Sequence, residues 1–459
     1  MKILVLAVLF TTLVACSGGG NSNSDGLFSP GSNRSVQDKV QGVWERSGYG
    51  VVARITGATV ELFDVTSETC LLAEISNDND FSQLVLSDNG REFSIADSTL
   101  SFDERYYKLD ALPENCAAPI GDSPSAVYDH VWHTFSDYYA FFEERHIDWQ
   151  AQRDNTRGEV NDAMSESQLF EVLAALIFPI DDEHVLLRAG DTVFSPATPK
   201  GFIQALIDEF NAQSDIAEVN EYLQLQLAQW DHIVRERYLD GNVASAANDT
   251  FVWGIIDGSV GYLRIDAMIL NFEDSIEDQV AEAELILDQI LTDLADTQSL
   301  IIDIRLNGGG ADPLSFAIAR RFADSERLVV SKFTRNSEGE GPLQSMYLGP
   351  VDRPSYLKPV ILITSKFSTS AAEVFTLAMR AWPQVTHIGE ATNGALSDVL
   401  EKPLPNGWQI ELGNEVYIDS AGASYEVSGI TPYLEVPIFS LPDRQDGQDS
   451  GLNAALEML

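Results

Sequence analysis

The pattern of apolar and polar positions changes twice along this chain. Over residues 41–110, short β-rich runs such as 50–55 (GVVARI) alternate with turn residues, which predicts a small antiparallel β unit. Apolar residues then follow helical spacing over 125–179, and a second helical stretch is expected over 201–238. Residues 240–249 (DGNVASAAND) have the composition of a loop.

Strand and helix patterns alternate from residue 251 to 437, which indicates βα units around a largely buried sheet. The predicted elements are strand 260–265, helix 275–294, strand 299–306, helix 314–322, strand 359–364 and helix 370–382. Asp312 and Pro313 are expected to supply an N-cap and a first-turn proline. Because sites in open α/β sheets lie at the carboxyl ends of strands, the two strand-to-helix turns are the places to look for chemistry.

Composition and charge indicate a folded protein and argue against a nucleic-acid-binding function. The chain has 459 residues, 44% of them hydrophobic, which predicts a folded protein of two or three domains. Its 71 acidic and 28 basic residues give a formal charge of −43. A charge of this sign repels phosphate backbones, so nucleic acid is not expected as a partner.

The first residues have the pattern of an export signal. Residues 3–14 are apolar after Met1 and Lys2, but they are too few to span a bilayer. They end at 13–16 (LVAC), which resembles the lipobox of bacterial lipoproteins and would make Cys16 the lipidated N-terminus, followed by a flexible tether. The alternative is an ordinary signal peptide with a chance cysteine. The resemblance implies an exported protein anchored to a membrane through lipid, the outer membrane in a two-membrane bacterium.

Two further cysteines, Cys70 and Cys116, remain after Cys16 is set aside. An even pair in an exported chain predicts a disulfide between them, and two buried free thiols are the alternative.

The two strand-to-helix turns carry the candidate chemistry. The glycines of 307–310 (NGGG) allow backbone N–H groups to point inward without a Cβ in the way, although such a turn is also found without function. Residues 370–373 (SAAE) have the pattern of a helix capping box. The same geometry would expose the Ser370 hydroxyl as a nucleophile beside a helix N-terminus.

Five segments in order resemble the C-terminal processing (tail-specific) serine peptidase family. They are 261–265 (GYLRI), 302–310 (IDIRLNGGG), 368–373 (STSAAE), 389–394 (GEATNG) and 429–432 (GITP). The resemblance implies that Ser370 is the nucleophile and Ser368 a neighbour. It also implies a crotonase/ClpP-like spiral ββα catalytic domain with a helical cap, and a preference for unfolded or C-terminal peptide segments.

The general base is expected to be a histidine. Relatives with a serine–lysine dyad carry lysine directly after the glycine of 389–394, where this chain has Ala395. Lys366 is too close on the preceding turn and Lys402 lies in the following segment. Residues 179–185 (PIDDEHV) resemble the segment that supplies the histidine in the tricorn-like branch, which makes His184 the candidate; a solvated acidic turn with a chance histidine is the alternative.

The surroundings of His184 are less well defined by the sequence. The three acids at 181–183 favour imidazolium and are expected to raise the pKa of His184. In the tricorn-like branch a glutamate before the last motif orients the histidine, and Glu426 matches it, with a surface acid as the alternative. The resemblance assigns the oxyanion hole to the N–H of Ala371 and of Gly309 or Gly310. No second histidine is suitably spaced for a metal site, and no cofactor is expected.

The sequence therefore predicts an α/β protein, an exported, lipid-anchored serine endopeptidase acting on peptide or protein substrates through Ser370, His184 and Glu426. The alternative is a non-catalytic ligand- or peptide-binding lipoprotein on the same fold. The predicted regions are a signal peptide (1–15), the lipidated cysteine and tether (16–35), a β-rich domain (36–120), a helical cap (121–250), the catalytic domain (251–440) and a C-terminal tail (441–459).

Overall fold

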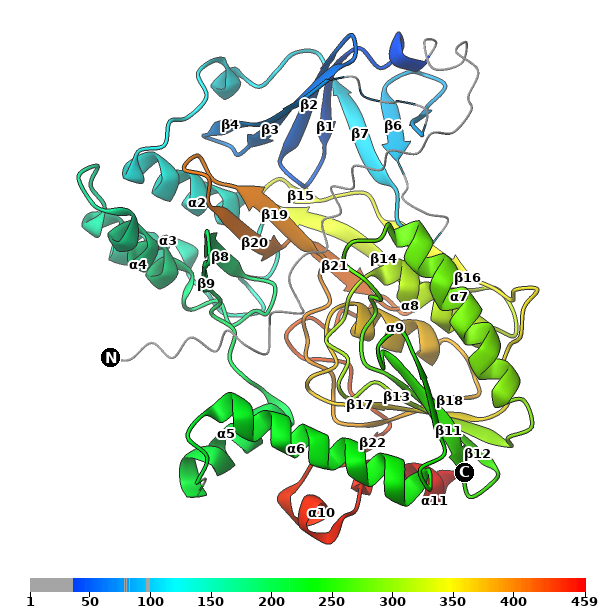
Figure 1. Cartoon of the computed structure of the whole chain (residues 1–459). Helices are drawn as coiled ribbons and strands as arrows, with labels where there is room; N and C mark the ends of the chain where they lie inside the picture. The colour runs from blue at the N-terminus through cyan, green and yellow to red at the C-terminus, as the bar shows by residue number, and fades with distance from the viewer. Residues whose placement is uncertain (1–35, 78, 80, 82, 96–99, 214) are drawn as a thin grey trace.

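The computed structural model describes residues 36–459 except 78, 80, 82, 96–99 and 214. The N-terminal part is a seven-stranded antiparallel sheet in the order β4-β3-β2-β1-β7-β6-β5, drawn in blue and cyan in Figure 1. Its strands are β1 (Gly42–Arg46), β2 (Val51–Thr56), β3 (Thr59–Val65), β4 (Cys70–Ser76), β5 (Val85–Leu86), β6 (Glu92–Ile95) and β7 (Glu104–Leu109). A disulfide joins Cys70, the first residue of β4, to Cys116 in a short 3-10 turn, Glu114–Ala117.

Helices follow where the apolar spacing predicts them. They are α2 (Pro124–Tyr138), α3 (Trp149–Thr156), α4 (Glu166–Ile177), α5 (Gly201–Gln213) and α6 (Val219–Ile233), which continues as a π-helical turn, Val234–Tyr238. Between α4 and α5, a hairpin of β8 (Leu186–Ala189) and β9 (Thr192–Phe194) pairs through β8 with a strand more than 200 residues away, β20 (Gln409–Gly413). Because that pairing is long-range, the local pattern does not predict this hairpin.

A second seven-stranded sheet forms the centre of the molecule, in the order β10-β11-β12-β13-β17-β18-β22. The strands are β10 (Val243–Ala246), β11 (Phe251–Ile256), β12 (Val260–Ile265), β13 (Ser299–Asp303), β17 (Val360–Thr364), β18 (Val385–Gly389) and β22 (Leu434–Glu435). From β12 to β22 all neighbours are parallel. The predicted loop at 240–249 is wrong in part, because residues 243–246 pair with β11 as an edge strand.

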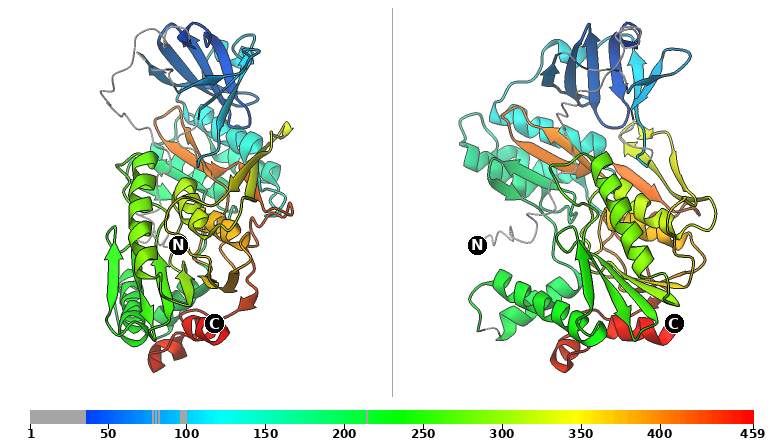
Figure 2. Two further views of the ribbon diagram at one scale, coloured as in Figure 1. Left: turned by 90° about the vertical axis from the view of Figure 1, so that its right-hand side faces the viewer. Right: turned by 45° about the vertical axis from the view of Figure 1, so that its right-hand side comes forward.

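Both faces of this sheet are covered. Helices α7 (Ile276–Asp293), α8 (Asp312–Ala319) and α9 (Ala371–Arg380) pack on one face, where Leu300, Ile302 and Leu362 point. Helices α5, α6 and α11 (Ser450–Met458) cover the other face, where Ile301 and Ile361 point. A strand buried on both faces is apolar at successive positions, which explains the run 300–302 (LII) in β13. Figures 1 and 2 show the β-rich domain and the α5–α6 layer at opposite ends of the molecule.

Two smaller sheets connect the central layer to the N-terminal domain. One contains β14 (Arg327–Asn336), β15 (Gly339–Glu340), β16 (Gln344–Leu348) and β21 (Glu415–Ile418), and the other β19 (Val399–Pro403), β20, β8 and β9. A last short helix is α10 (Leu441–Asp446). The structure is a mixed α/β protein with a β-rich N-terminal region.

One predicted cap is wrong. Ala311 is the N-cap of α8, and Asp312 is its first residue. Ala311 is held in an extended conformation because its N–H donates to the Met268 carbonyl (2.7 Å), and the helix begins at Asp312, one residue earlier than predicted. The Asp312 carboxylate instead accepts a hydrogen bond from the Tyr417 hydroxyl (2.8 Å).

Candidate active site

Ser370 lies in the turn between β17 and α9, at the N-cap of that helix. Its backbone has φ 56° and ψ −127°, a region that residues other than glycine rarely adopt. Ser370 is partly exposed, although the residues on both sides of it are buried. A strained, partly exposed serine at a strand-to-helix turn is the geometry that a nucleophile needs.

Glu373 fixes this turn from inside the protein. Its carboxylate is fully buried and accepts hydrogen bonds from the Thr392 hydroxyl (2.6 Å) and the N–H groups of Gly394 (2.8 Å) and Ala395 (2.9 Å). It also accepts from the Ser370 N–H (3.2 Å), which in addition donates to the Ala395 carbonyl (3.0 Å). Burial raises the pKa of Glu373 to about 7 against the effect of these hydrogen bonds. One glutamate therefore joins the Ser370 turn to the loop 392–395.

The glycine turn packs directly against Ser370. A Cβ on Gly309 would lie 2.7 Å from the Ser370 Cβ and 3.3 Å from the Ala371 nitrogen, so only glycine fits there. The Ala371 N–H donates to no acceptor in the part of the chain that the structure describes. The Gly309 N–H, in contrast, donates to the Asn307 side-chain oxygen (2.9 Å). Of these two N–H groups, that of Ala371 is therefore the one without a hydrogen-bond acceptor among the described residues, and Gly309 also provides the close packing against Ser370.

His184 lies in the loop between α4 and β8 and is 8% exposed. Its backbone N–H donates to the Asp182 carboxylate (2.9 Å), and its ring Nδ1 has no hydrogen-bond partner among the described residues. Burial lowers the pKa of His184, and this outweighs the nearby Asp182 charge, which raises it. The expected increase is therefore wrong in direction, because it neglected desolvation.

Charged groups surround the histidine loop. The Asp182 carboxylate accepts a hydrogen bond from the Tyr139 hydroxyl (2.7 Å) and lies 3.1 Å from the Arg145 guanidinium. Arg145 is also 3.7 Å from the Glu426 carboxylate, whose other oxygen accepts from the N–H groups of Leu396 (2.9 Å) and Ser397 (3.3 Å).

Glu426 is buried, so the surface-acid alternative is wrong. Burial, with Asp182 and Glu373 nearby, raises the pKa of Glu426 well above its usual value. The Glu426 oxygen that faces Arg145 has no hydrogen-bond partner within the described residues.

Contacts between loops bring the predicted residues together. Glu183, the residue before His184, accepts a hydrogen bond from the Asn393 side chain (2.6 Å), and the Asn393 N–H donates to the Ser368 carbonyl (2.9 Å). The Ser370 turn and the His184 loop therefore both contact the loop 392–397, and the glycine turn packs on the Ser370 turn, although these segments are far apart in the sequence.

Lys366 and Lys402, the two lysines considered in the sequence, make other contacts. Lys402 is buried in an ion pair with Asp64 of the N-terminal domain (2.6 Å), where its amine also donates to the Tyr49 carbonyl (2.5 Å). The Lys366 amine donates to the Thr392 carbonyl (3.0 Å), and the Ala395 position carries no base.

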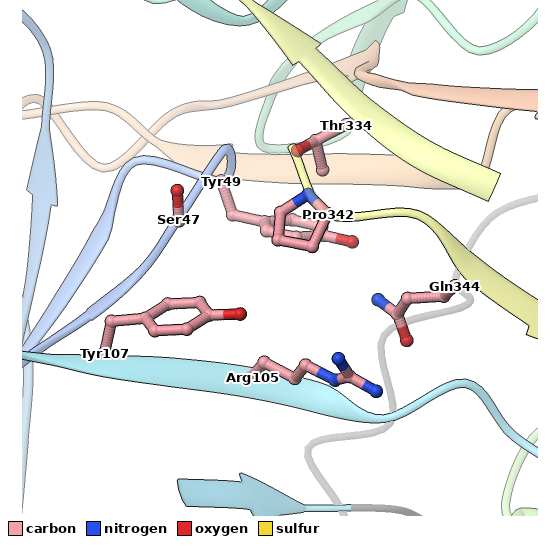
Figure 3. Close-up of a pocket in the computed structure, with 7 residues that line it drawn as sticks. All are labelled: Ser47, Tyr49, Arg105, Tyr107, Thr334, Pro342 and Gln344. Carbon is pink, nitrogen blue, oxygen red and sulfur yellow. The ribbon is translucent and has the colours of Figure 1, made fainter. Parts of the chain in front are cut away.

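Neither of the two cavities noted in the structure contains a candidate catalytic residue. Figure 3 shows a cavity of about 20 Å³ between β7, the turn after β1, and the β14–β16 region, lined by Ser47, Tyr49, Arg105, Tyr107, Thr334, Pro342 and Gln344. This volume suits about one water molecule. A groove of about 820 Å³ runs beside β10 and β11. Within the described residues, no group of three or more His, Cys, Asp and Glu is arranged to hold a metal ion.

Sequence reasoning assigned no role to Arg145, Tyr139 or Asn393, and it treated Asp182 only as one acid among three. The side chains of Arg145 and Tyr139 reach the site across the fold, so no local signal identifies them. Asn393 lies inside one of the five family-like segments, which was the available signal.

Family models match two parts of the chain. Residues 259–436 match Peptidase family S41, and residues 122–178 match the Tricorn protease C1 domain. Among curated proteins, the chain is 26% identical over 208 residues to a chloroplastic C-terminal processing peptidase of Tetradesmus obliquus, covering 45% of this chain and 40% of that protein. It is 25% identical over 233 residues to the Tricorn protease of Thermoplasma volcanium, covering 50% of this chain and 20% of that protein. The chain thus spans less than half the length of these relatives.

Solved structures share the fold. A Parabacteroides merdae protein named as a peptidase has a TM-score of 0.59 and 24% identity, covering 74% of this chain and 97% of that one. Mature CPAF has a TM-score of 0.50 and 14% identity, covering 73% and 95%.

Proposed function

We propose that this protein, whose residues 259–436 form a peptidase family S41 domain and which is homologous to C-terminal processing peptidases, is a serine endopeptidase. The observation that carries the proposal is Ser370, held at positive φ at the N-terminus of α9 and packed against the glycine turn. A helix cap alone needs neither feature, because ordinary N-caps have extended backbone.

In the proposed reaction, the Ser370 hydroxyl oxygen attacks the carbonyl carbon of a peptide bond while the His184 ring accepts the hydroxyl proton. The oxyanion that forms is stabilised by the Ala371 N–H, with the N–H of Gly309 or Gly310 as the second donor. The proton then passes from His184 to the leaving amine, and the acyl-enzyme forms. Water, deprotonated by His184, releases the acid product and restores Ser370.

Electrostatics of the site support His184 as the base. Its pKa lies below the usual value, so the ring is neutral and able to accept a proton at neutral pH. Glu426 is proposed to orient the ring, since Glu426 and His184 each have one buried atom without a hydrogen-bond partner among the described residues, and both lie near Arg145. Asp182 fixes the loop through the His184 backbone.

The location of the enzyme is part of the proposal. Cys16 lies outside the described residues, and the resemblance of 13–16 to a lipobox supports an exported protein with a lipid anchor. Among the helices that the structure describes, none is long and apolar enough to cross a membrane. Unfolded or C-terminal peptide segments are the proposed substrates, in keeping with the name of the Tetradesmus relative.

The test is labelling of the full chain with a fluorophosphonate probe, which reacts with an activated serine whatever the substrate. Wild type is expected to be labelled, and Ser370→Ala and His184→Ala are expected to lose labelling, while Ser428→Ala, a change of an exposed serine, keeps it. Folded wild type that is never labelled would contradict the peptidase proposal and favour the ligand-binding alternative.

A further inference from the structure

We infer that Asn393 is a positioning residue, which sets the His184 loop against the Ser370 turn through a hydrogen bond to Glu183. The inference rests on the proposed function, in which these two elements supply the base and the nucleophile.

Asn393 is 2% exposed and its side chain contacts three separate segments. Its amide nitrogen donates to a Glu183 carboxylate oxygen (2.6 Å) and to the Lys366 carbonyl (3.2 Å). Its amide oxygen accepts from the Lys200 amine (3.2 Å). The backbone N–H donates to the Ser368 carbonyl (2.9 Å).

These contacts join the loop that contains the proposed base to the turn that contains the proposed nucleophile. Glu183 directly precedes His184, whereas Lys366 and Ser368 belong to the turn that ends at Ser370. A movement of Asn393 would therefore change the separation of base and nucleophile without touching either one. Since catalysis is steep in this separation, a residue that fixes it controls the chemical step.

The chemistry of the contact calls for an amide. Glu183 needs a donor and the Lys200 ammonium needs an acceptor, and among neutral side chains of this size an asparagine supplies both at once. Aspartate has the same shape but places a second carboxylate against Glu183. The bond to Glu183 is charge-assisted, which makes it stronger than a bond between neutral groups.

The experiment compares three variants of the full chain with wild type: Asn393→Asp, Glu183→Gln, and the two changes combined. In the combined variant, the glutamine amide donates to the aspartate carboxylate, so the hydrogen bond re-forms with its direction reversed. The rate constant for fluorophosphonate labelling at saturating probe and the apparent probe affinity are measured separately.

We expect Asn393→Asp to lower the saturated labelling rate by about 100-fold with unchanged probe affinity, because geometry rather than binding is lost. Glu183→Gln alone is expected to have a smaller effect, since its side-chain oxygen still accepts the bond. The combined variant should recover at least half of the loss on a logarithmic scale. Asn393→Asp at the wild-type rate, or no recovery in a folded combined variant, would overturn the inference.

A matched control is Asn414→Asp. Asn414 is 1% exposed and its side chain donates to the Gly48 carbonyl (3.0 Å) at the contact with the N-terminal domain. This variant reports the general effect of a buried carboxylate on stability, and its folded fraction should label at the wild-type rate.

Hydrogen exchange separates this inference from the proposed function. Asn393→Asp should speed amide exchange in segments 182–186 and 366–371 together, and the combined variant should restore protection in both. If wild type is never labelled, the peptidase proposal fails, but hydrogen exchange still shows whether the Asn393–Glu183 contact holds the two segments together. Exchange that is unchanged in both segments would overturn the Asn393 inference on its own.

Discussion

Helices α4 and α9 begin with the same four-residue capping pattern, but the serine has a different backbone conformation and different neighbours in each. Ser165 and Gln168 form an ordinary capping box: the Ser165 backbone is extended at φ −77°, its hydroxyl accepts from the Gln168 N–H (3.3 Å), and the Gln168 side chain accepts from the Ser165 N–H (2.9 Å). At α9, the Ser370 backbone has φ 56°, and Glu373 accepts from three groups of the loop 392–395 as well as from Ser370.

The difference shows what turns a cap into a candidate nucleophile. The local pattern requires only that N–H groups at the helix start find acceptors, and Ser165 meets that requirement at the surface. At Ser370, a glycine turn packs on one side and a second loop on the other, and these hold a backbone conformation that the sequence alone disfavours. The predictions below test this comparison.

The largest effect is expected from Ser370→Ala. Removing the nucleophile should lower peptide hydrolysis by about 10⁴-fold or more, and labelling to background. Measurement of both on protein of confirmed fold checks it. Residual labelling at another site, located by mass spectrometry, would mean that Ser370 is only a cap.

Glu373 of α9 is a buried acid at the position where α4 has the neutral Gln168, and Glu373→Gln tests how this acid affects stability. Burial raises the pKa of Glu373 to about 7 from 4.5, so the folded state holds the proton more tightly. Its contribution to stability is fully present below pH 4.5 and is lost as the pH rises to 7, by up to about 3 kcal/mol. The free energy of unfolding should therefore fall less steeply over this window in Glu373→Gln, as measured by denaturant titration. If the free energy of unfolding changed with pH equally in wild type and in Glu373→Gln, the raised pKa of Glu373 would be refuted.

Gly309→Ala tests the packing of the glycine turn on Ser370. The new Cβ would lie 2.7 Å from the Ser370 Cβ, and the backbone has φ 101°, so labelling should fall about tenfold or more. Gly57→Ala is the matched control, since Gly57 also has positive φ (64°) but open space around it. Equal labelling of the two variants would show that the close approach has no function.

The pH dependence of labelling should report the protonation of His184, the proposed base for Ser370. Because the pKa of His184 is lowered, the rate should be constant near neutral pH and fall only below about pH 6.5, as the ring takes up its proton. The Asp182 charge raises this pKa, so Asp182→Asn should move the fall to still lower pH. A fall that moves to higher pH would contradict the assigned contact.

The smallest effect is expected from Ser165→Ala. Loss of an ordinary cap should cost about 1 kcal/mol of stability, and labelling should be unchanged. Thermal unfolding and labelling together measure both. A loss of activity greater than the loss of folded protein would show that α4 does more than support the cap region.

Most of the fold could be predicted because its signals are local. Helices α7 and α9 and strands β12 and β17 lie where apolar spacing and turn residues place them. The edge strand β10 was missed because its own segment has the composition of a loop, and the hairpin β8–β9 because it pairs with the distant strand β20. Ser370, His184 and the glycine turn were proposed from motifs, whereas Arg145 and Tyr139 carry no motif and reach the site only through folding.

The sequence by itself determined where α7, α9, β12 and β17 lie, the Cys70 and Cys116 pair, and the short motifs at Ser370 and His184, because each depends on neighbouring residues or on residue type. Only the tertiary structure decided that Gly309 touches Ser370, that Arg145 and Tyr139 reach Asp182, and that burial lowers the pKa of His184. The reason is physical: desolvation and close packing depend on how segments far apart in the chain enclose a group, and a pattern along the chain does not contain that enclosure.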